Sequence, residues 1–130
     1  MTQSILTLIG TGELIDKIAI LEIKAERITD PARSANVRTE LSLLRHRRDA
    51  ALPPGPLLDA LTRRLKSINE RIWDLEDAIR DCERRGDFGP AFVTVARAVY
   101  RTNDERAAVK REINLATGSN LIEEKSYASY

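Results

Sequence analysis

Two acidic pairs are the residues of this sequence whose types and spacing come nearest to a metal-binding or catalytic set. Glu13 and Asp16 lie three residues apart, and Glu76 and Asp77 are adjacent. Carboxylates three residues apart share one face of a helix, and two such helices could hold Mg²⁺ through oxygen ligands. The alternative interpretation is structural. In that case the first pair complements the positive end of a helix dipole, and the second belongs to a solvated helix face.

Two stripes of polar and aromatic residues follow helical spacing beside apolar positions. Asparagine is a poor residue for the interior of a helix, because its amide competes with the backbone for hydrogen bonds. The asparagines of these stripes either fix the register of the helices, as in coiled coils, or line a polar groove that holds a ligand. The stripes consist of Asn69, Trp73, Glu76, Arg80 and Glu83, and of Tyr100, Asn103, Ala107, Lys110 and Asn114.

A candidate binding surface combines these stripes with the beginning of the first predicted helix and with the C-terminal tail. Lys17, Arg80 and Lys110 would contact an anionic group, and the asparagines would fix its orientation. The surface is predicted to include Glu13, Asp16, Lys17, Asn69, Trp73, Glu76, Arg80, Asn103, Lys110, Asn114, Glu124, Lys125 and Tyr127.

The sequence contains one cysteine, Cys82, and one histidine, His46, and these counts limit the disulfides and metal centres that it can form. One cysteine excludes an internal disulfide and a multi-cysteine zinc site, and one histidine excludes a two-histidine metal centre. The basic cluster Arg45–Arg48 is expected to be a solvated helix end. Nucleic-acid binding is not expected, because the net charge is only +1 and no aromatic residues interrupt the cluster.

Proline and glycine divide the chain into four helical stretches. Asp30 can cap a helix that begins with Pro31, and three prolines between residues 53 and 56 must end one. Residues 4–9 could form a small strand or an extended cover, and residues 119–130 form a tail. The predicted helices run from Thr11 to about Thr29, from Pro31 or Ser34 to about Leu52, from Leu57 to Arg85, and from Pro90 to just before Gly118.

Apolar periodicity supports an all-α fold. In the third stretch, apolar residues alternate spacings of 3 and 4 from Leu58 to Cys82, which is typical of a packed helical seam. Short connections favour antiparallel neighbours. The 130 residues therefore predict one domain, an antiparallel bundle of four helices in which the third and fourth form a long hairpin.

The first helix is apolar over more than one face, because Ile15, Ala19 and Ile23 lie beside its main seam. Such a helix is either central or part of a subunit interface, and we expect a homodimer through this face. Glu22 and Glu26 fall within it. They predict either a structural ion pair with another helix or a buried acid used for chemistry.

No apolar run approaches the roughly 18 residues of a membrane span, and the first ten residues lack the basic region of a signal peptide. A cytoplasmic protein without membrane association is expected.

Four groups of motifs lie along the chain: Gly12–Ile18 with Ile20–Lys24, Ile68-Asn69 with Trp73–Asp77 and Ile79-Arg80, Asn103–Ala107 with Lys110, Ile113 and Asn114, and Glu123–Tyr127. Together they resemble a family of small bacterial helical proteins of unknown function. The resemblance implies a stand-alone bacterial protein whose polar residues are family features, and it implies no particular reaction or ligand.

Together, these observations favour a binding or assembly module with a polar groove for an anionic small molecule or protein partner. The alternative is an Mg²⁺-dependent nucleotide phosphohydrolase of the all-α pyrophosphatase type that would use Glu13, Asp16, Glu76 and Asp77. These enzymes carry a richer acidic cluster than this chain does. The leading hypothesis needs no cofactor, whereas the alternative needs magnesium.

Overall fold

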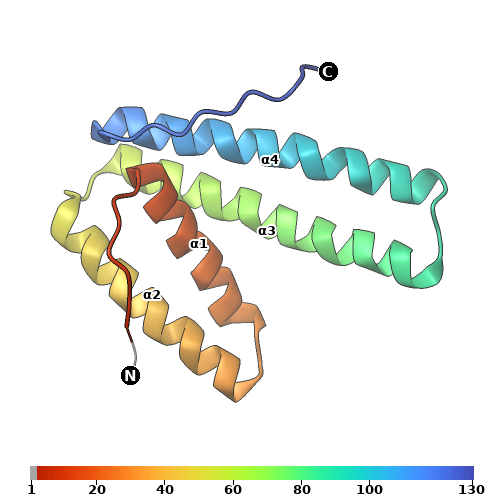
Figure 1. Cartoon of the computed structure of the whole chain (residues 1–130), viewed down its shortest axis with the longest axis horizontal. Coiled ribbons are helices and arrows are strands. Elements are labelled where there is room, and N and C mark those ends of the chain that lie inside the picture. Colours follow the sequence, from red (N-terminus) through yellow and green to blue (C-terminus); the bar gives the residue numbers. More distant parts are fainter. Residues whose placement is uncertain (1–2) are drawn as a thin grey trace.

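The computed structural model describes residues 3–130, which form four helices and no strand (Figure 1). The helices are α1 (Thr11–Arg27), α2 (Pro31–Ala51), α3 (Pro56–Arg85) and α4 (Pro90–Thr117). Figure 1 shows α3 and α4 side by side as a long hairpin, with the shorter α1–α2 hairpin packed against one end of it. The predicted all-α bundle is confirmed. In none of the described helices do length and apolar character suffice to cross a membrane.

Helix boundaries fall where the local chemistry places them. The side chain of Asp30 accepts a hydrogen bond from the backbone N–H of Arg33 at 2.9 Å and caps α2, which begins with proline. Gly86 follows α3 with φ of 65°, a left-handed conformation that glycine adopts at little cost. Because α1 ends at Arg27, it is two residues shorter than the pattern predicted.

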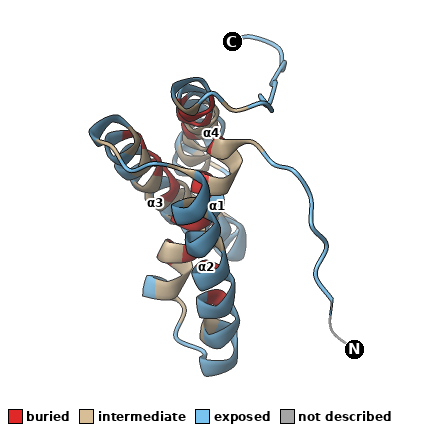
Figure 2. Cartoon of the chain, turned by 90° about the vertical axis from the view of Figure 1, so that its left-hand side faces the viewer, coloured by how far each residue is buried: buried red, intermediate tan, exposed pale blue. Residues whose placement is uncertain are grey.

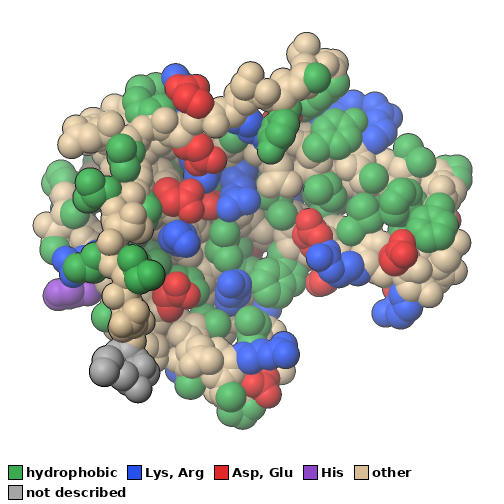
Figure 3. Space-filling model, in the orientation of Figure 1, with side chains coloured by type: hydrophobic (Ala, Val, Ile, Leu, Met, Phe, Trp, Pro, Cys, Tyr) green, Lys and Arg blue, Asp and Glu red, His purple; other side chains and the backbone are tan. Residues whose placement is uncertain are grey.

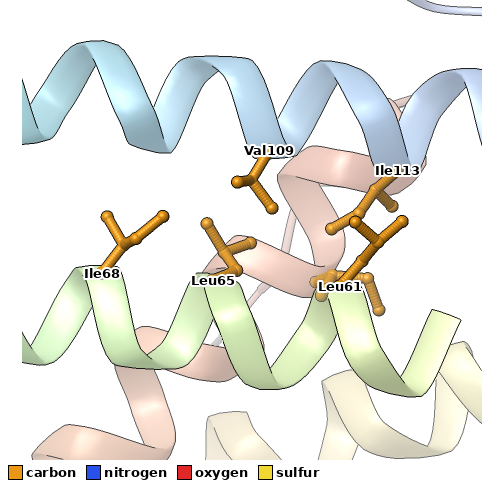
Figure 4. Packing of buried hydrophobic residues seen from close by; sticks show 6 residues of the cluster. Leu61, Leu65, Ile68, Val109 and Ile113 are labelled. Carbon is orange, nitrogen blue, oxygen red and sulfur yellow. The ribbon is translucent and has the colours of Figure 1, made fainter. Parts of the chain in front are cut away.

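Helix α1 is central, because it contacts α2, α3 and α4. Figure 2 shows the buried residues concentrated where α1, α3 and α4 meet. In Figure 4, Val109 and Ile113 of α4 point toward residues of α3. The core at this junction consists of Ile15, Leu61, Leu65, Ile68, Val109 and Ile113, and a second core between α1 and α2 consists of Ile18, Leu21, Val37 and Leu41.

The apolar faces of α1 are covered within a single chain, which corrects the predicted use of one face as a dimer interface. Ile15, Ala19 and Ile23 are each at most 1% exposed in the isolated chain. The second face exists because α1 packs on α2 and also on the α3–α4 hairpin. These three side chains are therefore not available to a second copy, and the homodimer itself stays a prediction.

Glu22 and Glu26 form ion pairs with neighbouring helices of the same chain, so the structural interpretation of these acids is confirmed. Glu22 lies 3.0 Å from Arg45 of α2, and Glu26 binds Lys66 of α3. The hydrogen bond from Lys66 to Glu26 raises the pKa of Lys66 despite partial burial. These pairs tie α1 to both α2 and α3.

Residues 3–9 are extended but form neither a strand nor a cover, which corrects that part of the prediction. The side chains of Ile5, Leu6 and Leu8 are at least 85% exposed. Figure 2 shows this segment leading away from the helices. Leu8 and Ile9 border a small hollow together with Leu121 and Ile122 of the tail, but the segment does not cover a helix.

Candidate functional site

Helices α1 and α4 are in close backbone contact at Gly12. A Cβ atom built at Gly12 would lie 2.3 Å from the carbonyl oxygen of Lys110, so only glycine fits there. The backbone N–H of Gly12 donates to Oδ1 of Asn114 at 2.7 Å, and that of Thr11 donates to Oγ of Ser119 at 3.2 Å. Gly10 provides no side-chain cap for α1. The side chains of Asn114 and Ser119 instead accept the first N–H groups of the helix.

A single buried carboxylate joins three helices next to this contact. Asp16 of α1 is 1% exposed, and it accepts hydrogen bonds from Nδ2 of Asn69 on α3 at 2.9 Å and from Nε of Arg106 on α4 at 3.0 Å. A second bond from Arg106 to the other carboxylate oxygen makes the pair bidentate. The hydrogen bonds to Asp16 raise the pKa of Arg106 even though burial acts in the opposite direction.

One turn further along α4, Lys110 lies between two carboxylates from different segments. Its Nζ is 2.7 Å from Oε2 of Glu13 on α1 and 2.7 Å from Oε2 of Glu123 in the tail. The side chain of Lys110 is only 10% exposed. Burial lowers the pKa of Lys110, but the hydrogen bonds to Glu123 and Glu13 outweigh it and the net pKa is raised. Lys110 is therefore a buried cation that depends on anionic partners.

The tail runs back along α4 in an extended conformation (Figure 1), and side-chain contacts hold it there. Glu124 lies 3.1 Å from Arg111, and Lys125 lies 2.6 Å from Asp104. The hydroxyl of Tyr130 donates to Asp104 at 2.6 Å, and its ring packs edge-on against Tyr100 with 5.2 Å between centroids. All residues from 120 to 130 are exposed.

A hollow of about 1070 Å³ lies between the tail and α4, and we call it the α4–tail groove. Glu13 borders it from α1, and the tail borders it from Glu123 to Tyr130. Acidic and basic side chains intermingle on this face of the molecule (Figure 3). From α4 the groove is lined by Val99, Tyr100, Asn103, Asp104, Arg106, Ala107 and Lys110.

Comparison with protein families gives a match over residues 6–130, described as a family of unknown function. The chain belongs to the DUF6165 family. No curated protein and no solved structure matches it. The match to DUF6165 spans all four helices and the whole tail, so the helix junction and the α4–tail groove both lie within the family domain.

Six of the predicted site residues line the groove of this DUF6165 protein, and three lie in the helix junction beneath it. Asn103 lines the groove while its Nδ2 donates to the carbonyl of Val99 in its own helix at 3.0 Å. The junction residues are Asp16, Asn69 and Asn114, and all three are buried. Asn69 of α3 donates to Asp16 of α1, and Asn114 of α4 accepts from the backbone of Gly12 on α1. The groove contains Glu13, Asn103, Lys110, Glu124, Lys125 and Tyr127.

The remaining four predicted residues do not line the groove. Lys17 is exposed on α1. Arg80 forms an ion pair with Glu76 one turn earlier on α3. The guanidinium carbon of Arg27, at the end of α1, lies over the ring of Trp73, 5.7 Å from the ring centroid. Apart from Asn69 in the helix junction, the predicted site residues of the α3 stripe thus lie outside the groove.

Three residues of the site were missed by sequence reasoning. Arg106 occupies the same face of α4 as Asn103 and Lys110, so helical spacing could have included it. Asp104 and Glu123 belong to motifs that were noted, but their roles depend on the path of the tail, and periodicity carries no information about that path.

Convergence of the α1 and α3 carboxylates, which a magnesium site would require, is not found among residues 3–130. In this part of the chain no three Asp, Glu, His or Cys side chains gather in a way that could hold a metal ion. Asp16 and Glu13 bind cations of α4, and Glu76 binds Arg80.

Acidification is expected to release the tail, because Asp104 binds it in the charged form. Hydrogen bonds from Lys125 and from Tyr130 lower the pKa of Asp104. A carboxylate with a lowered folded-state pKa contributes above its unfolded value of about 3.9, and the contribution disappears as the pH falls through the folded value. We expect NMR chemical shifts of residues 123–130 to stay constant from about pH 5 to 8, to begin to change as the pH falls below about 4, and to reach those of a free chain only below the lowered pKa of Asp104. Tail shifts that stay unchanged while the Asp104 carboxyl group itself becomes protonated would show that Asp104 does not hold the tail.

Proposed function

We propose that this DUF6165 protein is a binding or assembly module whose working surface is the α4–tail groove. In this proposal, a ligand or partner places an anionic group against Lys110, where Glu123 lies in the unbound protein. The observation that carries the proposal is that a buried lysine takes one of its two carboxylate partners from an exposed tail.

The two carboxylates on Lys110 differ in how firmly they are fixed. Glu13 belongs to the first turn of α1, which Gly12 and Asn114 anchor to α4. Glu123 has a side chain that is 58% exposed and lies in a segment without helix or strand. A buried ammonium group needs an anionic partner, but nothing requires that partner to be Glu123. An incoming carboxylate or phosphate could take its place with little loss of charge pairing.

Arg106 supplies a second donor group on the same side of the groove. Asp16 engages its Nε and one terminal nitrogen, Nη2, and thereby fixes the plane of the guanidinium. Within the described chain Nη1 has no hydrogen-bond partner, and Arg106 lines the groove, so donors are available to a ligand. Asn103, also in the groove, retains an amide oxygen that can orient a bound group.

The proposal predicts that Glu123→Gln binds inorganic phosphate more tightly than the unmodified protein. Removal of the competing carboxylate should raise the affinity for phosphate by about two- to fivefold, which corresponds to the free energy of one partly exposed ion pair. The measurement is an NMR titration of the ¹⁵N-labelled full chain, with shifts expected at Glu13, Arg106 and Lys110.

A matched control separates this effect from the general loss of a negative charge. Glu112→Gln removes the same charge from α4, but Glu112 pairs with Arg64 on α3 and does not line the groove. We expect phosphate affinity in that variant to remain as in the unmodified protein. Equal gains in both variants, or phosphate shifts spread over the surface, would contradict an anion site at Lys110.

A further inference from the structure

We infer that the partner of the α4–tail groove is an extended segment of another protein that carries two acidic residues followed by a basic residue and an aromatic one. This inference rests on the proposed function and names the class of partner. In the unbound protein, the C-terminal tail occupies the place of that segment.

The order of charges along α4 carries the inference. The tail presents, in order, Glu123 to Lys110, Glu124 to Arg111, and Lys125 to Asp104. Its last residue, Tyr130, then reaches Asp104 and the ring of Tyr100, nearer the beginning of α4. The groove therefore discriminates between sequences by charge order, because a segment with its basic residue first would place like charges together.

The tail is bound in a way that permits exchange. Within the described chain, neither apolar core includes a residue beyond Ile113. Each exposed ion pair contributes little by itself. The tail is therefore held by exposed side-chain contacts and not by burial in an apolar core.

The groove also has room that the tail does not fill. The hollow of about 1070 Å³ is bordered by the tail itself, so it lies between the tail and α4. Val99 and Ala107 contribute small apolar side chains to its lining, and the rings of Tyr100 and Tyr127 border it. A partner segment with the same charge order and a large apolar side chain over Ala107 would gain burial that the tail lacks.

Because the tail is covalently attached, it competes as though it were present at roughly millimolar concentration. A partner binds only when its contacts exceed those of the tail. Weakening the tail should therefore increase the affinity for a segment added in trans.

The test uses a fluorescent synthetic peptide with the sequence of residues 119–130 and the full-length double variant Glu123→Gln/Lys125→Gln. Fluorescence anisotropy should show that this variant binds the peptide at least about tenfold more tightly than the unmodified protein does. A peptide of the same composition, with the lysine moved ahead of the acidic pair, should bind at least about tenfold more weakly. Glu105→Gln, which removes a charge that pairs with Arg71 outside the groove, should bind like the unmodified protein.

The outcomes distinguish this inference from the proposed function. If phosphate binds at Lys110 but neither peptide binds, or if both peptides bind equally, the inferred partner class is wrong and the anion site stands. If phosphate and peptide both fail, the proposed function fails as well. Dimerisation of the unmodified protein that the double variant abolishes, measured by light scattering, would overturn a separate partner in favour of a second copy of this chain.

Discussion

Replacing Asp16 by alanine is expected to lower the free energy of unfolding by about 3–5 kcal/mol, the range for breaking one side of a buried ion pair. Asp16 is almost completely buried, and its loss leaves the guanidinium of Arg106 and the amide of Asn69 without their acceptor. Urea denaturation followed by circular dichroism measures this loss. Asp74→Ala is the control, because Asp74 is 68% exposed and its pair with Arg27 should contribute less than about 1 kcal/mol.

A double-mutant cycle tests whether the cost comes from the pair itself. In Asp16→Ala, the unpaired guanidinium of Arg106 accounts for part of the lost stability. The double variant Asp16→Ala/Arg106→Ala should therefore lose about 1–3 kcal/mol less free energy of unfolding than the two single variants lose together. Strictly additive losses would contradict the assigned role of Asp16 as the acceptor that joins α1, α3 and α4.

Gly12→Ala is the second change with a large expected effect, a destabilisation of about 1–3 kcal/mol from overpacking. The added methyl group would lie 2.3 Å from the carbonyl oxygen of Lys110, and a backbone atom cannot move aside as a flexible side chain can. Helix α1 must then move away from α4, which breaks the bond from Gly12 to Asn114 and separates Glu13 from Lys110. Thermal and urea denaturation measure the stability.

The matched control is Gly55→Ala at the N-terminal end of α3. Gly55 has an extended backbone with φ of −174°, and a Cβ atom there would meet nothing within 4 Å. Its replacement should change the stability by no more than about 0.5 kcal/mol. Equal stability of the two alanine variants would show that the α1–α4 contact is looser than described.

The elements of this fold could be predicted from the sequence because proline, glycine and apolar spacing act locally. Pro31, Pro56 and Pro90 begin three of the helices, and Gly86 and Gly118 follow two of them. The expectation of a dimer interface on α1 did not anticipate that helices of the same chain cover Ile15, Ala19 and Ile23. Periodicity shows how wide an apolar face is, but it does not show how many helices of the same chain will cover it.

The candidate site could be predicted only in part, for a similar reason. Lys110 and Asn103 were recognised because polar residues at helical spacing stand out beside an apolar seam. Asn69 and Asn114 were recognised in the same way, yet they bind Asp16 and the backbone of Gly12, as the structural interpretation of such asparagines predicts. Contacts between the tail and α4 join residues distant in sequence through an irregular segment, and no periodic pattern encodes them.

In the proposed function, Glu123 occupies a position on Lys110 that a ligand takes over. The most direct measurement is an NMR titration of the ¹⁵N-labelled full chain with unlabelled peptide of the sequence 119–130. We expect the signals of residues 123–130 to move to free-chain positions with the same midpoint as the changes at Asn103 and Lys110. Changes on α4 while the tail keeps its bound shifts, or a tail that never leaves at saturating peptide, would contradict it.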